Sequence, residues 1–484
     1  MDQLTLKNVL KFLSIIGIAL SLFFLIPIFT GYIYHEDIQK FILFDLSFFS
    51  INLLFFLLMY KHVLKMRIKG SILAVNLIWI LLGIAGAIPL YLYSDISFAD
   101  AFFEAISGFT TTGATIYSDI ESLPKSILML RSLMHWLGGM GIIVLGVGLF
   151  SLINPTGSLT MFKAESTGIK IDKITPKIKD TALRLWIIYL VFTFLDIILL
   201  KLGGMGLFDA INHAFSTIST GGFSTKNSSI GYWKDNYFIL WVTTIFMFLS
   251  GVNFLAHLRI WSGDLSGYKS EEFRWYLFIF LFLSTLLTVE HIYSSNDSFS
   301  YSITHAFFTI SSVMTTTGFA SLDYEQWGLF AIAIVFIAMM IGGNAGSTAG
   351  GAKVIRHIVW FKNMFSQLKQ ILHPNAIVGV YIDKNRVSGK VLGSVSGFMM
   401  LFILTNIFVT IYLFVRGYDV MTDISTALAC VGNIGPGFAL SGPAQNYSFF
   451  SWEDKIVLSI SMIIGRLEFY TVMLLFARDF WRRY

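Results

Sequence analysis

The sequence predicts an all-α membrane protein with four membrane–pore-loop–membrane repeats around one pore, plus two extra N-terminal transmembrane helices. Three observations support this fold. Of the 484 residues, 55% are hydrophobic and only 13% are charged, whereas soluble domains carry about 25% charged residues. Long apolar runs alternate with shorter ones, each of which is soon followed by a glycine. The shorter runs resemble one another, and such self-similarity indicates a repeat architecture.

Ten apolar runs are long enough to cross a bilayer, which needs about 20 helical residues. They lie near residues 10–34, 42–61, 70–94, 127–153, 183–203, 236–256, 273–292, 327–343, 391–416 and 454–477. The first two runs have no counterpart elsewhere in the chain. We therefore assign residues 1–69 to two N-terminal transmembrane helices, and the rest to repeats at 70–162, 163–264, 265–372 and 373–484.

Four further apolar stretches are too short to cross; they lie near 99–110, 208–219, 303–315 and 422–431. Inside a membrane, such a segment is tolerated only where protein buries it or where it lines a water-filled cavity. We therefore expect re-entrant half-helices. Their sequences align as DAFFEAISGFTTTG (100–113), DAINHAFSTISTGG (209–222), HAFFTISSVMTTTG (305–318) and TDISTALACVGNIG (422–435). The first three copies agree clearly, whereas the fourth is degenerate and is placed mainly by its position.

The basic residues predict the orientation. They cluster at 61–69, 163–184, 353–390 and 478–483, and the positive-inside rule places such segments in the cytoplasm. Span parity then brings all four half-helices in from the outer side. The net charge of +5 is explained by these short segments, so no nucleic-acid partner is expected. Because Cys430 is the single cysteine, neither an intrachain disulfide nor a cysteine-based metal cluster is expected.

The residues that end each half-helix are those that a cation filter requires. Rings of backbone carbonyls can replace the hydration shell of a cation, and glycine permits the backbone angles that aim successive carbonyls inward. Neighbouring threonines can add hydroxyl oxygens or anchor the strand, and the partially negative C-terminal end of each half-helix favours a cation. The alternative is that these Thr-Gly runs are small-residue contacts between helices. One copy fits that alternative well, but repeated copies between full spans favour a filter.

Eight stretches in order resemble the TrkH/TrkG branch of the Trk/Ktr/HKT potassium-uptake superfamily, over nearly the whole chain. They are TTTGAT (110–115), RSLMHWLGGMGIIV (131–144), HAFSTISTGGFST (213–225), MTTTGF (314–319), GGNAGSTAGGAKVIR (342–356), LHPNAI (372–377), NIGPGF (433–438) and GRLEFY (465–470). The resemblance implies a potassium-translocating subunit of a bacterial Trk-type uptake system. Such a subunit is a multi-pass protein of the inner (cytoplasmic) membrane, with its filter facing outside.

The same resemblance implies partners and a cargo. A homodimer is expected in the membrane lipid, together with a cytosolic TrkA-like nucleotide-binding regulatory ring. The transported ion would be K+. The sequence has no nucleotide-binding glycine pattern of its own, so we expect any nucleotide to bind the regulatory ring and not this chain.

Residue by residue, the resemblance gives the K+-binding filter positions. They are Thr111, Thr112, Gly113, Thr220, Gly221, Gly222, Thr316, Thr317, Gly318, Asn433, Ile434 and Gly435. The fourth strand departs from the Thr-Gly pattern, since it has Asn433 and Ile434. All four strands keep the terminal glycine, which in this superfamily favours potassium over sodium.

A glycine-rich run interrupts the eighth long run at residues 342–351. Its glycines are Gly342, Gly343, Gly346, Gly350 and Gly351. A helix loses roughly 1 kcal/mol for each glycine relative to alanine, so we expect a flexible loop beneath the filter that blocks the path until it moves. Such a segment resembles the intramembrane gating loop of the same family. The alternative is a cytoplasmic turn that closes the span. Lys353 and Arg466 would repel cations in the closed state of such a gate, or Arg466 and Glu468 would instead lie near the membrane interface.

Three more polar residues stand in apolar surroundings and are expected to be structural. Asp196 has no acidic neighbour in the sequence, so a hydrogen-bonded contact between helices is expected rather than an ion relay. Glu104 and His213 occupy equivalent places in the first two half-helices. We expect both to act as scaffold behind the filter.

Two other classes of protein compete with a channel-like subunit. A proton- or sodium-coupled secondary cation transporter also contains broken helices and repeats, but usually as two large repeats with intramembrane carboxylates. A membrane enzyme requires a nucleophile–base set or a metal-ligand cluster, and the sequence shows neither at matching depth. We therefore expect no enzymatic activity.

Overall fold

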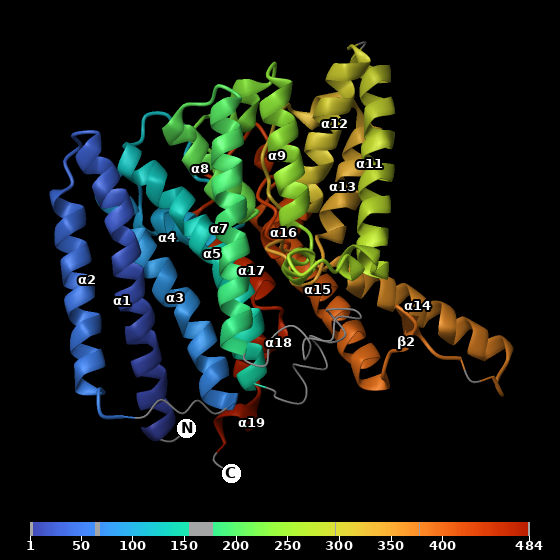
Figure 1. Ribbon diagram of the computed structural model, residues 1–484, viewed down its shortest axis with the longest axis horizontal. Coiled ribbons are helices and arrows are strands. Elements are labelled where there is room, and N and C mark those ends of the chain that lie inside the picture. The colour runs from blue at the N-terminus through green and yellow to red at the C-terminus, as the bar shows by residue number, and fades with distance from the viewer. Residues whose placement is uncertain (1–2, 63–67, 154–177, 296, 377, 483–484) are drawn as a thin grey trace.

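The computed structural model describes residues 3–62, 68–153, 178–295, 297–376 and 378–482. The basic segment at 163–177 and the predicted boundary between the first two repeats lie outside the described residues. Within them, the chain is helical apart from one short hairpin, as predicted. The beginning of α1 (Gln3–Ile33) and the short helix α19 (Arg478–Trp481) lie at the same end of the molecule (Figure 1).

Two helices precede the repeats, as predicted. α1 and α2 (Gln39–Leu58) pack against each other and against α3 (Ile68–Tyr93), at one edge of the molecule (Figure 1). Ser21 of α1 donates a hydrogen bond to Asp45 of α2, with 2.7 Å between Oγ and Oδ1. A buried carboxylate without a hydrogen-bond partner destabilises the protein. This bond therefore favours the relative rotation of α1 and α2 that brings Ser21 and Asp45 together.

Each of the four repeats consists of a helix, a half-helix and a second helix. The repeats are α3, α4 (Phe98–Phe109) and α5 (Lys125–Ile153); α7 (Ile178–Leu202), α8 (Leu207–Ile218) and α9 (Tyr237–Ser250); α11 (Glu271–Ser295), α12 (Phe299–Met314) and α13 (Leu329–Ile341); and α15 (Gly389–Arg416), α16 (Val420–Val431) and α17 (Trp452–Arg466). The half-helices coincide with the four predicted stretches. Three of them begin directly after an N-cap residue, because the side chains of Ser97, Ser298 and Asp419 accept hydrogen bonds from the first backbone amides of the helix.

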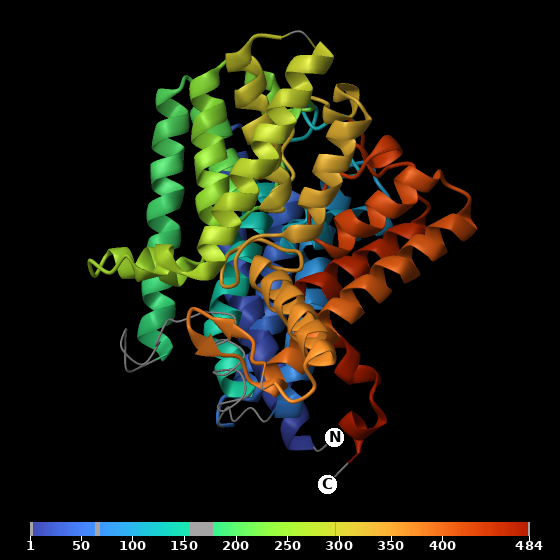
Figure 2. The same ribbon diagram turned by 90° about the vertical axis from the view of Figure 1, so that its right-hand side faces the viewer.

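The repeats close into a ring. The second helix of each repeat packs against the half-helix of the next: α5 against α8, α9 against α12, and α13 against α16. The last pair, α17 against α4, joins the fourth repeat to the first. The four half-helices are therefore held in the centre, and the first helices of the repeats stand around them (Figures 1 and 2).

Two of the predicted spans are not continuous helices. The run at 236–256 is divided into α9 and α10 (Phe254–Ile260), which are bent by 99°, and the run at 454–477 into α17 and α18 (Tyr470–Phe476), bent by 116°. The first break is stable because another part of the chain satisfies its backbone: the carbonyl of Gly251 accepts the amide of Asn344 at 2.8 Å. At the second break Glu468 and Phe469 both have positive φ. The prediction of continuous helices there was wrong.

Within the described residues, six helices are long and apolar enough to cross a membrane, or up to eight if each bent pair is one span. The predicted eighth span is shorter than its apolar run, because α13 ends at Ile341 where the glycines begin. After them comes α14 (Val354–Leu372), followed by a hairpin of β1 (Tyr381–Ile382) and β2 (Asn385–Arg386) that lies beside it (Figure 2). Short 3₁₀ turns span Ser229–Trp233, Ser266–Lys269, Tyr324–Trp327 and Ala439–Ser441.

The packing of α5 on α4 makes a stability prediction. A Cβ added at Gly138 would lie 1.9 Å from the carbonyl oxygen of Phe109, and backbone cannot move away cheaply. Gly138→Ala is therefore expected to destabilise the fold by about 1–3 kcal/mol, the usual cost of overpacking. Thermal unfolding followed by a maleimide dye measures this, because Cys430 is the single cysteine and is buried.

The control for that prediction is Gly141→Ala in the same helix, where nothing lies within 4 Å of the new Cβ. It makes the same chemical change without the contact. Equal unfolding temperatures for the two variants would contradict the close approach of α5 to α4.

Candidate functional site

All four half-helices end in the same backbone motif. In each, the amide of the third residue after the helix bonds to the carbonyl five residues earlier: Thr112 to Ser107 at 2.9 Å, and Gly221 to Ser216, Thr317 to Ser312 and Ile434 to Ala429 at 2.8 Å each. The amide of the second residue after the helix bonds to the carbonyl three residues before it, and the two bonds together form a Schellman cap in every copy. The fourth copy, degenerate in sequence, is therefore equivalent in backbone geometry. We call residues 111–113, 220–222, 316–318 and 433–435 glycine segments 1 to 4.

The first and last residues of each glycine segment have left-handed backbone angles. At the first residue φ is 54° for Thr111, 55° for Thr220, 58° for Thr316 and 54° for Asn433. At the last residue φ is 83° for Gly113, 84° for Gly222, 82° for Gly318 and 101° for Gly435. A β-branched residue at positive φ is strained, and such strain concentrates at functional sites. Three threonines in this conformation therefore mark the segments as a candidate site.

The segments contact one another in cyclic order. A Cβ placed on the terminal glycine of each segment would collide with the carbonyl oxygen of the middle residue of the next. The distances are 2.1 Å from Gly113 to Gly221, 2.0 Å from Gly222 to Thr317, 2.2 Å from Gly318 to Ile434 and 2.7 Å from Gly435 to Thr112. Only glycine fits at these four positions, and the carbonyls of four segments surround one axis.

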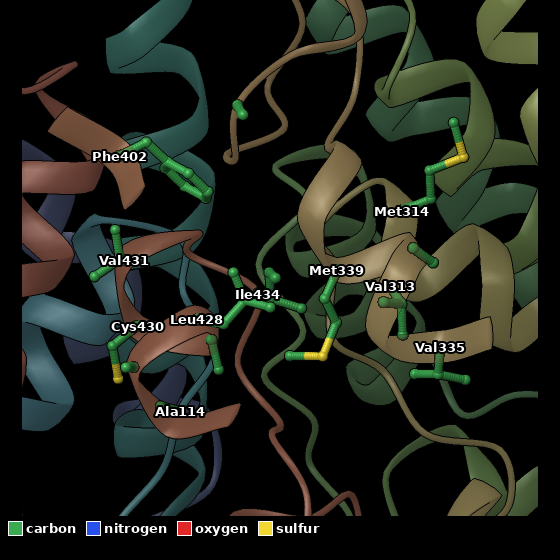
Figure 3. Close-up of a cluster of buried hydrophobic side chains, with 14 of the residues drawn as sticks. Ala114, Val313, Met314, Val335, Met339, Phe402, Leu428, Cys430, Val431 and Ile434 are labelled. Atoms are coloured by element: carbon green, nitrogen blue, oxygen red, sulfur yellow. The ribbon is translucent and has the colours of Figure 1, made fainter. Parts of the chain in front are cut away.

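The side chains of the middle residues are buried in the surrounding protein. The hydroxyl of Thr112 bonds to that of Thr110 at 2.8 Å, and the hydroxyl of Thr317 bonds to that of Thr315 at 2.7 Å. Ile434 is fully buried in an apolar cluster with Leu428 of α16 and Met339 of α13 (Figure 3).

Segment 2 has a glycine at the middle position, and a neighbouring side chain takes up the room. A Cβ on Gly221 would lie 2.2 Å from Nδ1 of His135 in α5. The ring of His135 stacks on Phe223 with centroids 4.0 Å apart, and its Nδ1 lies 3.3 Å from the hydroxyl of Ser216. An α5 side chain thus fills the space that threonine or isoleucine fills in the other segments.

Segment 4 is tied to segment 1 and to its own repeat. The amide nitrogen Nδ2 of Asn433 donates to the hydroxyl of Thr112 at 2.9 Å and to the carbonyl of Met462 at 3.0 Å. The hydroxyl of Tyr447 donates to the carbonyl of Gly435 at 2.7 Å. Asn433 therefore has a specific partner in the ring, which the alignment of the fourth copy could not reveal.

A small cavity of about 70 Å³ opens at the glycine end of the four segments, and we call it the vestibule. All four terminal glycines line it, together with Arg131, Lys226, Asn227 and other residues of the following loops. Beside it, the side chain of Asn227 donates to Asp119 at 3.0 Å, and this bond holds the pKa of the Asp119 carboxyl below its ordinary value. Asp119 is therefore ionised at neutral pH.

The glycine-rich loop, residues 342–353, lies at the other end of the segments. The amide of Gly350 donates to the hydroxyl of Thr316 at 2.6 Å, and a Cβ there would lie 2.4 Å from the carbonyl oxygen of Gly432. Thr348 bonds through its hydroxyl to the carbonyl of Ile218, the last residue of α8, at 3.1 Å. Most of the loop is buried, which argues against the alternative of a cytoplasmic turn that only closes the span.

The loop is fixed at two further points, and the helix that follows it at one. The carbonyl of Gly346 accepts the amide of Phe254 at 3.0 Å, at the start of α10. The buried Glu272 of α11 accepts the amide of Ala345 at 2.7 Å. Its neighbour Glu271 forms a 2.5 Å ion pair with Lys362 of α14. The start of α11 therefore contacts both the loop and the helix that follows it.

Both predicted basic residues contact the loop. Nζ of Lys353 donates to the carbonyl of Ala349, and Nη1 of Arg466 donates to the carbonyl of Thr348 at 3.0 Å. Arg466 is buried in the protein, which favours its expected place beside the path over the alternative of a position near the membrane interface. Glu468 pairs instead with Arg356 at 2.9 Å, which confirms that Arg466 and Glu468 have separate partners.

The other polar residues predicted to be structural are Asp196, Glu104 and His213. Asp196 is buried in α7 beside Thr217 of α8, which is a contact between helices of the kind expected, although neither carboxylate oxygen makes a hydrogen bond of standard geometry. Glu104 and His213 do contact the loops that follow segments 1 and 2, as expected of scaffold residues. Arg131 and His135 were missed as site residues. The signal was available, because charged and imidazole side chains within an apolar span indicate function.

The fold and the site define a class: a polytopic membrane protein of four repeats, whose half-helices end in glycine segments that contact one another in a ring. A sequence profile of the TrkH family, described as cation transport protein, matches residues 37–483. The chain belongs to this family, which comprises transporters and not enzymes.

Individual relatives agree with this assignment. The chain is 38% identical to the Trk system potassium uptake protein TrkH of Vibrio parahaemolyticus, over 87% of this chain and 88% of that one. It is 37% identical to the Trk system potassium uptake protein TrkG of Escherichia coli K12, over 87% of each chain. The crystal structure of the potassium transporter TrkH from Vibrio parahaemolyticus superposes with a TM-score of 0.89 and 32% identity, covering 99% of this chain and all of that one.

Proposed function

We propose that this chain is the potassium-translocating subunit of a bacterial Trk-type uptake system, and that cations pass through the ring of the four glycine segments. The observation that carries the proposal is the cyclic contact of each terminal glycine with a carbonyl of the next segment. It surrounds one axis with backbone oxygens, the ligands that replace the hydration shell of a dehydrated cation. The names of the relatives indicate potassium as the ion.

The proposed K+ site comprises the twelve residues of the four segments. Because the side chains of the middle positions are buried in the protein, selectivity comes from the carbonyls rather than from charge. The four half-helices direct their C-terminal ends toward this ring, and the partial negative charge there adds to the attraction of a cation.

The proposed gate is the loop at residues 342–353. It contacts segment 3 through Gly350, which also lies close to Gly432, the residue before segment 4. Lys353, at the end of the loop, and Arg466, in α17, both donate hydrogen bonds to carbonyls of the loop. Their positive charges raise the energy of a cation in the closed path. Movement depends on the glycines Gly342, Gly343, Gly346, Gly350 and Gly351.

In this proposal the protein lies in the bacterial cytoplasmic membrane with the vestibule facing outward. The basic segments that support this orientation include 353–390 and 478–483. It acts as a homodimer with a cytosolic TrkA-like nucleotide-binding ring, as the sequence resemblance implies. The names of the relatives, which place them in a Trk system, support an assembly with other components.

The experiment that tests the function is growth rescue. A bacterium that lacks potassium uptake is expected to grow at low potassium when it produces this protein, and added sodium is expected to inhibit that growth only weakly. Potassium flux into proteoliposomes without a proton or sodium gradient then distinguishes passive conduction from coupled transport. Absence of rescue by protein that is present and folded in the membrane would refute the proposal.

A further inference from the structure

The first repeat carries a buried charged pair that the proposed filter does not use as a ligand. We propose that Glu104 and Arg131 form a positioning pair, which holds the vestibule ends of glycine segments 1 and 2 and prevents a net positive charge in the vestibule. The proposal rests on the filter function proposed above. It gives a role in selectivity to two residues that do not bind the ion.

Glu104 anchors the chain that leaves segment 1. It is fully buried in α4. Its Oε2 accepts the amide of Ile116 at 2.9 Å, and its Oε1 accepts the hydroxyl of Thr115 at 3.0 Å. Because these residues follow Gly113 by only two and three positions, a shift of the carboxylate would move the last carbonyl of segment 1.

Arg131 of α5 extends this anchor to the second repeat. Its Nε donates to Glu104 at 2.9 Å, its Nη2 to the hydroxyl of Thr115 at 3.1 Å, and its Nη1 to the carbonyl of Ser224 at 3.1 Å. The guanidinium also lies over the ring of Phe223, 4.1 Å from its centroid, within cation–π range. Phe223 and Ser224 directly follow segment 2, so one side chain fixes the ends of two adjacent segments.

An anchor of this kind does not require charges. His213 occupies in α8 the place of Glu104 in α4, and its Nε2 lies 2.9 Å from the hydroxyl of Ser224. At the same place in α16, Thr426 donates to Ser441 at 2.8 Å. A buried ion pair is seldom more stabilising than a well-packed neutral pair. The charges in the first repeat therefore have a reason other than stability.

That reason lies in the vestibule. Arg131 lines it together with the four terminal glycines, and a guanidinium without a counter-charge there would repel incoming cations. A cleft of one charge sign changes ion association rates by about 10- to 1,000-fold. Glu104 compensates this charge, and Glu121, 3.6 Å away, compensates Lys226, the other basic residue of the lining.

The test uses purified protein in proteoliposomes, with ionic strength set by an impermeant N-methyl-D-glucamine salt. Glu104→Gln is expected to lower potassium flux about tenfold at low ionic strength, because it leaves Arg131 uncompensated. The loss is expected to shrink as salt rises, because the screening length falls from about 30 Å at 0.01 M to about 8 Å at 0.15 M. Glu104→Asp, which keeps the charge, is expected to recover most of the flux.

The double variant Glu104→Gln, Arg131→Gln separates charge from position. It has no uncompensated charge, so its flux is expected to return to within about threefold of wild type. Its preference for potassium over sodium is expected to be about tenfold lower than that of the wild type, because the side chains that anchor segments 1 and 2 are both replaced. The matched control is Lys455→Gln, which breaks the ion pair with Asp100 between the fourth and first repeats, outside the vestibule lining. It is expected to keep wild-type selectivity.

Two results would overturn the inference. One is wild-type flux and selectivity in folded Glu104→Gln at low ionic strength. The other is a flux loss that salt does not reduce and that the double variant shares, since that pattern indicates a structural role alone. Should Glu104→Gln not fold, the double variant decides, and an unchanged selectivity in it overturns the inference. Wild-type protein that does not prefer potassium would instead refute the proposed function.

Discussion

Gly318→Ser is expected to reduce the preference for potassium over sodium by at least about tenfold, which corresponds to about 1.4 kcal/mol. The new Cβ would lie 2.2 Å from the carbonyl oxygen of Ile434 and 2.9 Å from the ring of Pro436. The backbone at Gly318 also has φ of 82°, which disfavours serine. To relieve the close contacts and the backbone strain, the carbonyls of segments 3 and 4 must move apart. Permeability ratios measured in a planar bilayer report this, and Gly113→Ser is expected to act in the same way.

The control for this prediction is Gly204→Ser. Gly204 has φ of 94°, but nothing lies within 4 Å of its added Cβ. It lies between α7 and α8, outside the segments. It therefore reproduces the backbone strain without the contact and is expected to keep wild-type selectivity. Unchanged permeability ratios in Gly318→Ser and Gly113→Ser would contradict the assignment of the segments as a filter.

Deletion of residues 346–350 is expected to raise potassium flux by about tenfold or more. The deletion removes the contact of Gly350 with Thr316 and the bond that Arg466 donates to Thr348. Hydrogen bonds contribute about 0.5–1.5 kcal/mol each, so loss of two or three moves a closed loop toward the open state by roughly that factor. Flux into proteoliposomes loaded with equal amounts of protein measures the change.

A substitution that keeps the chain length accompanies the deletion. Arg466→Gln loses a charge and the bond to Thr348, and we expect a smaller rise in flux. Ser347→Ala is the matched control, because among the described residues the hydroxyl of Ser347 bonds only within the loop, to the carbonyl of Asn344. This variant is expected to leave flux unchanged. A lower or equal flux in folded deletion protein would count against a gate in this loop.

The half-helices could be predicted because their cause is local. Short apolar stretches with capping residues such as Ser97 and Ser298 and a terminal glycine carry the whole signal in a few positions. The breaks between α9 and α10 and between α17 and α18 could not be predicted in this way. Their apolar runs continue through the bend, and the carbonyl of Gly251 is satisfied by Asn344, far along the chain. Hydropathy does not detect a partner that only the fold brings near.

The same distinction applies within the candidate site. The glycines of segments 1 to 3 were evident from the repeat, but the role of Asn433 depends on contacts with Thr112 and Met462 that no alignment of half-helices includes. Arg131 and Glu104 meet because α5 and α4 pack side by side. Pairwise contacts between helices, within one repeat or between two, therefore had to come from the structure.

The cyclic contact of the glycine segments explains how one copy can lose its sequence signature and keep its shape. The middle positions hold Thr112, Gly221, Thr317 and Ile434. Each of the three side chains lies in the core of the protein, whereas the terminal glycine of the adjoining segment approaches the main-chain oxygen. The side chain at this position is thus free to follow its local packing, while the torsion angles are constrained from two sides. A search for equivalent segments in other proteins should therefore compare backbone torsion angles before residue types.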